Sequence, residues 1–77
     1  MIRELDNVIL ECDLTQYGLT RGDVGTVVLV HEGGAGYEVE FTALDGETIA
    51  VVTLSAGQVR AAVGGEIAHA RGLVRAA

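Results

Sequence analysis

The range Leu19–Val30 constrains the fold most tightly, because a glycine-rich turn there leads directly into an apolar run rich in β-branched residues. Gly22 is free to adopt a positive φ, and the side chain of Asp23 is expected to accept hydrogen bonds from neighbouring amides. Gly25 allows a bulge or a close backbone approach as the strand begins. The residues that follow fit a strand covered on both faces. This stretch therefore predicts a turn and then a central strand over 23–31.

Four further segments have the composition of short strands bounded by turn residues. They are 7–12, 37–42, 47–54 and 58–62. The second of these alternates most cleanly, which places Tyr37, Val39 and Phe41 on the core face. The Asp45-Gly46 pair predicts a tight hairpin between the second and third, whereas 13–21 reads as a structured loop.

Five short strands in a chain of 77 residues predict an all-β fold, a small five-stranded barrel of the SH3-like type that hides its edges by closure. We expect the barrel to occupy residues 1–62 and a C-terminal tail to occupy 63–77. The tail carries a weak apolar stripe that predicts a short helical or frayed segment, although Gly72 weakens it. The stripe consists of Ile67, Ala70, Leu73 and Val74.

The charge balance bears on the class of partner. The chain has five Arg, no Lys and eleven acids, for a net charge of −6, and only 4% of its residues are aromatic. A negative surface repels a phosphate backbone, and a chain without Trp is a poor platform for stacking bases. The composition therefore disfavours nucleic acid and favours a protein partner with a basic surface.

Cys12 is the single cysteine, so no internal disulfide can form, and a reducing cytoplasm fits best. The N-terminus has no signal-peptide pattern, and no apolar stretch approaches the roughly 18 residues of a membrane span, so we expect a soluble cytoplasmic protein. Cys12, His31 and His69 show no ligand spacing around one another. We therefore predict neither a metal site nor a cofactor.

Three carboxylates are the main candidate site. Glu38 and Glu40 lie on the outward face of the alternating strand, and Glu47 follows the Asp45-Gly46 hairpin. A solvated face, a docking patch for a basic partner, and catalysis or metal binding all remain open for this cluster. Tyr17 is the aromatic residue expected to be partly exposed, in a loop that flanks the peptide groove of SH3-type barrels. No residue is nominated as catalytic, so we expect no enzyme.

The chain also contains an ordered set of short motifs: Glu4-Leu5-Asp6, Asp13-Leu14, Tyr17-Gly18-Leu19, Gly22–Val28, Tyr37–Phe41, Ala50–Leu54 and Val59-Arg60. This order resembles the small bacterial family called domain of unknown function 4926, over residues 2–62 and again at 66–69. The resemblance implies a stand-alone SH3-like barrel and implies no activity. Genes of this kind lie beside other small genes, which implies a protein partner encoded nearby.

A looser resemblance covers only Gly22–Val28, which is similar to the KOW-type motif of ribosomal and transcription-elongation proteins. It implies an alternative function, a nucleic-acid or ribosome-associated barrel that acts through its loops. The acidic balance argues against it. The leading hypothesis is an acidic, cytoplasmic, bacterial protein-interaction module that docks a basic partner protein, and a homo-oligomer held by the tail stays open.

Overall fold

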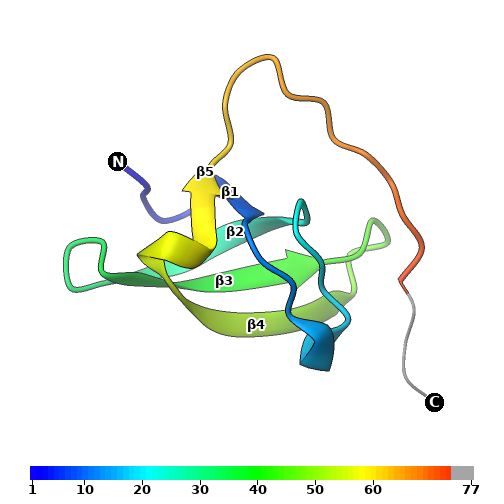
Figure 1. Ribbon diagram of the computed structural model, residues 1–77, viewed down its shortest axis with the longest axis horizontal. Helices are drawn as coiled ribbons and strands as arrows, with labels where there is room; N and C mark the ends of the chain where they lie inside the picture. The colour runs from blue at the N-terminus through cyan, green and yellow to red at the C-terminus, as the bar shows by residue number, and fades with distance from the viewer. Residues whose placement is uncertain (74–77) are drawn as a thin grey trace.

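Five antiparallel strands form one sheet in the computed structural model, which describes residues 1–73 (Figure 1). The strands are β1 (Asn7–Leu10), β2 (Val24–His31), β3 (Gly36–Thr42), β4 (Thr48–Ser55) and β5 (Val59–Ala61). Short 3-10 helices, η1 (Thr15–Tyr17) and η2 (Ala56–Gln58), lie in the first loop and between the last two strands. The predicted all-β, five-stranded class is therefore confirmed.

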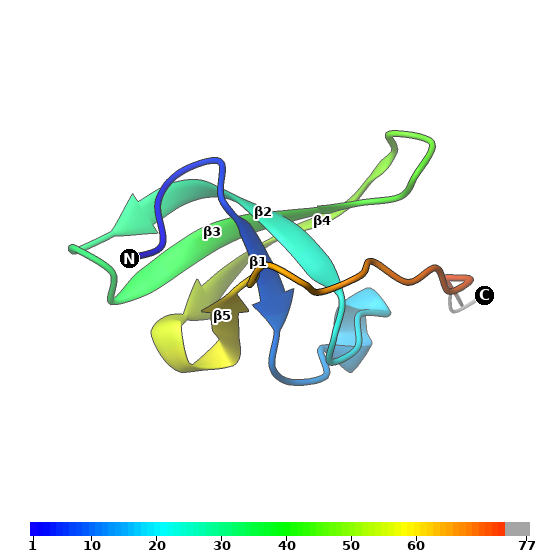
Figure 2. The same cartoon turned by 90° about the horizontal axis from the view of Figure 1, so that it is seen from above.

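The sheet is curled and barrel-like. Its strand order is β4-β3-β2-β1-β5, so the two edge strands are consecutive in the chain and are joined only by the three residues of η2. So short a connection requires the two edges to approach each other. Figure 2 shows the result, with β1 and β5 crossing the layer formed by β2, β3 and β4.

The core lies on the inner face of this curled sheet. Tyr37, Val39 and Phe41 of β3 are all buried, as their alternation predicts. They pack with inward residues of the other strands and with the loop around η1. The full set is Val8, Leu10, Leu14, Leu19, Val27, Tyr37, Val39, Phe41, Val52, Leu54 and Val59.

The predicted burial of β2 on both faces is wrong. Val28 and Leu29 are 42% and 44% exposed. The register against β3 shifts between Val27 and Leu29, which is the signature of a β-bulge. Over residues 1–73, these two apolar side chains of β2 are therefore partly exposed to solvent and not covered by a second layer.

The turn before β2 has the predicted local chemistry. Gly22 has a φ of 97°, and the N–H of Thr20 donates to Oδ2 of Asp23 over 2.8 Å. The other strand bounds differ from expectation by one or two residues. The first strand ends at Leu10 rather than residue 12, and the N–H of Glu11, the next residue, donates to the carbonyl of Gln58, the last residue of η2.

Residues 63–73 of the tail contain no helix, so the helical form of the tail prediction is wrong over that range. Ile67 is 92% exposed, and an isolated segment without a surface to pack on does not hold a helix. Figure 1 shows the tail leaving β5 and arching away from the sheet. Val74, the last residue of the predicted stripe, lies outside the described residues. No helix among residues 1–73 is long and apolar enough to span a membrane.

Truncation after Val63 is expected to leave the barrel folded, because residues 64–72 are exposed and contribute no side chain to the core. The far-ultraviolet circular dichroism spectrum should keep its β signature. Light scattering on both forms will show whether the tail holds an oligomer together. Loss of the β signature on truncation would mean that the tail completes the fold.

The start of the tail is held by an ion pair whose titration can be measured. Arg60 approaches Glu66 at 2.7 Å, and the N–H of Val63 donates to Oε1 of Glu66 over 2.8 Å. These bonds, that from Arg60 foremost, lower the pKa of Glu66 from 4.5 to about 2. Because the folded-state pKa is depressed, the contact stabilises the fold fully above pH 4.5 and is lost as the pH falls toward 2.

We expect the side-chain carboxyl carbon of Glu66 to titrate with a midpoint at about pH 2 in an NMR pH series. Arg60→Ala should return the pKa of Glu66 toward 4.5, since the hydrogen bond that lowers it most is then gone. An ordinary midpoint for Glu66 in the wild type would show that the ion pair does not persist in solution.

Candidate functional site

The candidate site lies on the outer face of the β2-β3-β4 layer. Because Tyr37, Val39 and Phe41 point inward, Glu38 and Glu40 must point outward. Glu38 lies between Leu29 of β2 and Thr53 of β4 in the register of the sheet. Glu40 lies between Thr26 and Val51 in the same way. The two carboxylates therefore occupy the middle strand of this face.

Glu38 is fixed by two neighbouring strands. Its Oε2 lies 2.6 Å from Nε2 of His31, at the end of β2. The hydroxyl of Thr53 donates to both carboxylate oxygens, over 2.9 and 2.7 Å. The hydrogen bond to His31, followed by that to Thr53, lowers the pKa of Glu38 below its usual value. This carboxylate therefore stays ionised at neutral pH.

Glu40 has one such partner. The hydroxyl of Thr48, in the first residue of β4, donates to Oε2 of Glu40 over 2.9 Å. A neutral donor orients the carboxylate without cancelling its charge. Glu38 and Glu40 thus form an ordered acidic pair on one strand.

The other two predicted site residues lie outside the strands. Glu47 lies before β4, in the loop that follows β3, where its N–H donates to Oδ1 of Asp45 over 2.9 Å. Val51, not Glu47, is the residue opposite Glu40. Tyr17 is 42% exposed in η1, and Figure 2 shows η1 well separated from the loop between β3 and β4.

Exposed apolar side chains border the acidic pair, and the sequence reasoning missed them. Val28 and Leu29 of β2 and Val51 of β4 are between 42% and 53% exposed. The apolar run of β2 is the sequence feature that contains two of them, but such a run predicts a strand covered on both faces. We name the set of Val28, Leu29, Glu38, Glu40 and Val51 the outer face.

Two arginines bind acids elsewhere in the molecule. Arg60 lies 3.4 Å from Glu11 and 2.7 Å from Glu66, and Arg71 lies 2.6 Å from Asp23. Over residues 1–73 neither Glu38 nor Glu40 forms an ion pair with an arginine. Among the described residues, therefore, no arginine neutralises the negative charge of the outer face.

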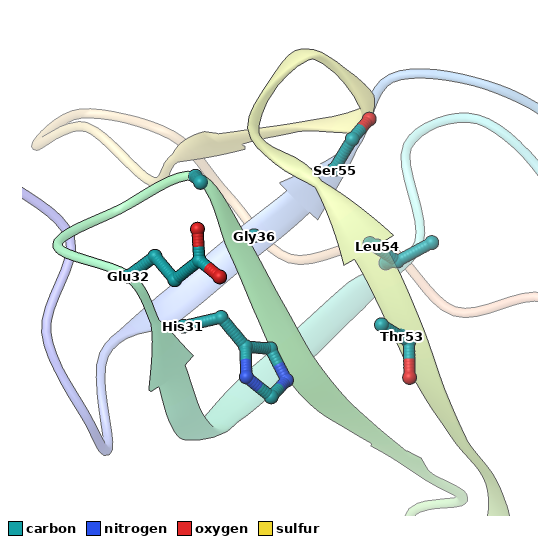
Figure 3. Close-up of a pocket in the computed structure, with 7 residues that line it drawn as sticks. His31, Glu32, Gly36, Thr53, Leu54 and Ser55 are labelled. Atoms are coloured by element: carbon teal, nitrogen blue, oxygen red, sulfur yellow. The ribbon is translucent and has the colours of Figure 1, made fainter.

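A hollow of about 480 Å³ opens beside His31, where the β2-β3 hairpin meets the end of β4 (Figure 3). It is lined by His31, Glu32, Ala35, Gly36, Thr53, Leu54 and Ser55. The hydroxyl of Ser55 lies 3.2 Å from Oε1 of Gln58 and donates to it, so it is not paired with a base. Within residues 1–73, no group of three or more His, Cys, Asp or Glu side chains could hold a metal ion.

The fold and this face define a small, all-β, barrel-like domain with an acidic and partly apolar outer surface. A family model described as "Domain of unknown function (DUF4926)" matches residues 4–61, from just before β1 to the end of β5. The chain therefore belongs to this family, which confirms the resemblance seen in its motifs. Comparisons with curated proteins and with solved structures found no match.

Proposed function

We propose that this protein is a non-enzymatic interaction module that docks a basic surface of a partner protein on its outer face. The observation that carries the proposal is the ordered acidic pair in the middle of an uncovered sheet face, without an arginine partner over residues 1–73. Carboxylates placed in this way steer a basic partner during encounter and disfavour acidic ones.

The apolar border supports docking over a role in solubility alone. Leu29 stands beside Glu38 in the sheet, and Val51 stands beside Glu40. A face whose only use is solubility has no need of half-exposed Leu and Val side chains around its charges. In a docked complex these side chains would be removed from water, at about 25 cal/mol per Å² of apolar surface. Affinity would then come from the apolar border and orientation from the acids.

An enzymatic role has less support. General acid–base catalysis by two carboxylates requires environments that separate their pKa values. Glu38 and Glu40 both lie on the open outer face and both accept bonds from threonine hydroxyls. The hydroxyl of Thr53 donates to Glu38 and not to His31, so within residues 1–73 it is not paired with the imidazole as a base. We therefore nominate no catalytic residue.

Affinity capture from the native host with three matched baits tests the proposal. The baits are the wild type, Glu40→Lys and Glu4→Lys. Both variants change the net charge by the same amount, but only the first alters the outer face. A partner docked on the outer face should be recovered by the wild type and by Glu4→Lys and be depleted with Glu40→Lys. Equal recovery by all three baits would mean that the outer face does not bind the partner.

The KOW-like alternative makes the opposite prediction about RNA. With a net charge of −6 and an acidic outer face, the chain should show no retention of RNA in a filter-binding assay at low salt, where electrostatic attraction is strongest. A basic barrel protein of similar size is the positive control. Salt-sensitive retention of RNA by this chain would favour the alternative function over protein docking.

A further inference from the structure

Beyond Glu66, the described part of the tail forms hydrogen bonds with the barrel through the side chain of Arg71. The guanidinium of Arg71 donates from Nε to Oδ1 of Asp23 over 2.8 Å and from Nη2 to Oδ2 over 2.6 Å. Its Nη2 also donates to the carbonyl oxygen of Gly18 over 2.9 Å. The guanidinium therefore binds the carboxylate of Asp23 bidentately and also donates to the carbonyl of Gly18, which precedes Asp23 in the same loop. This is the geometry that a planar guanidinium recognises best.

Both acceptors are fixed by the barrel itself. The N–H of Thr20 donates to Oδ2 of Asp23, and the N–H of Asp23 donates to the carbonyl of Thr20 over 3.0 Å. Gly18 ends η1, where its own N–H donates to the carbonyl of Thr15 over 3.1 Å. None of these bonds involves the tail, so the acceptor positions do not depend on Arg71.

The carboxylate also remains charged. Burial raises the pKa of Asp23, but the bonds from Arg71 and from the N–H of Thr20 outweigh that effect and hold it below its usual value. Only 17% of the side chain of Asp23 is exposed. A partly buried carboxylate that can accept two parallel N–H bonds favours a guanidinium over other cations.

The occupant, in contrast, is weakly held. Residues 67–70 are exposed, and Figure 1 shows this part of the chain bridging through solvent. Within residues 67–73, Arg71 makes the only polar contact with the barrel. The ion pair of a half-exposed arginine and the partly buried side chain of Leu73 must together offset the entropy of closing that loop, so the tail is expected to leave and return readily. Gly18 and Asp23 lie within the range matched by the family model, whereas Arg71 lies outside it.

We propose that Asp23 and the carbonyl of Gly18 form an arginine-binding site, which Arg71 fills in cis and which accepts an arginine side chain of another polypeptide when the tail departs. The site is separate from the outer face and does not rest on the function proposed above. Its ligand class is a guanidinium on an extended peptide. A lysine ammonium is a poor substitute, because it cannot make two parallel bonds to the carboxylate and reach the carbonyl as well.

The test uses the full-length chain with Arg71→Ala, which empties the site without touching the core. The probes are the blocked tripeptides N-acetyl-Gly-Arg-Gly-amide and N-acetyl-Gly-Lys-Gly-amide, titrated while the backbone amides are followed by NMR. With the arginine peptide, the amides of Gly18, Thr20 and Asp23 should shift progressively toward saturation. The lysine peptide should bind roughly tenfold more weakly. The wild type should bind the arginine peptide several-fold more weakly than Arg71→Ala, since its own arginine competes.

The double variant Arg71→Ala/Asp23→Asn is the matched control and should abolish the response, while its melting curve shows that the fold is kept. Absence of shifts at these three amides in Arg71→Ala, or equal affinity for the two peptides, would overturn the proposal. Equal affinity in the wild type and Arg71→Ala would overturn occupancy by Arg71. A wild-type dimer in sedimentation velocity that disappears in Arg71→Ala would identify a second copy as the source of the trans arginine and would support the same site.

Discussion

Gly25→Val is expected to destabilise the domain by roughly 1–3 kcal/mol, the usual cost of overpacking a well-packed core. Gly25 is buried in β2, and a Cβ at this position would lie 2.5 Å from Cγ1 of Val39 and 2.9 Å from Cε1 of Phe41. Both neighbours belong to the core, so neither can simply move into solvent. A domain of this size has on the order of 3–5 kcal/mol of stability in total, so this loss would remove a large share of it.

The cause is close packing and not backbone strain. The φ of Gly25 lies outside the positive region, whereas that of Gly22 lies within it. Even Gly25→Ala should therefore lower the midpoint of urea unfolding. Gly57→Ala is the control, since a Cβ there meets no atom within 4 Å. A Gly25→Val variant that melts at the wild-type temperature would show that Val39 and Phe41 of β3 do not pack closely against Gly25.

Charge reversal of the acidic pair, Glu38→Lys together with Glu40→Lys, is expected to slow association with a basic partner by about tenfold or more at low salt, the lower end of the range for electrostatic steering. The wild-type association rate should fall as salt rises, because the attraction is screened beyond about 10 Å at 0.1 M ionic strength. The reversed protein should show a flat or inverted salt dependence. Stopped-flow mixing with the captured partner at two salt concentrations measures both.

The same double variant should melt close to the wild-type temperature, because its charges lie on an uncovered face and not in the core. Its fold is then not the reason for slower binding. Glu4→Lys, which makes half the change in net charge and leaves the outer face intact, should change the rate only slightly. If the reversed protein associates as fast as the wild type at low salt, the acidic pair serves solubility and not docking.

Much of the barrel could be predicted because its signals are local. The alternation of Tyr37, Val39 and Phe41 fixed the inner face of β3, and the glycine turns fixed where the strands begin and end. The outward position of Glu38 and Glu40 followed from the same alternation. Each of these inferences depends on residues only a few positions apart. Because side chains alternate between the two faces of a strand, such short patterns predict which face each residue occupies.

Features that depend on distant contacts could not be predicted. The bulge in β2 arises from its register against β3, and the exposure of Leu29 arises from the lack of a second layer. No local pattern brings Arg71 to Asp23, which lies 48 positions away in the chain. The tail stripe had helical spacing, but a stripe is only stabilised by a surface to pack on, and Ile67 has none.

Mapping the bound partner onto the barrel by NMR tests the central claim most directly. Isotope-labelled chain is titrated with the unlabelled captured partner, and the loss of amide exposure is read by cross-saturation. We expect the affected amides to lie in β2, β3 and β4, around Leu29, Glu38, Glu40 and Val51. Cross-saturation confined to β1, β5 or the η1 loop, with β3 unaffected, would contradict it.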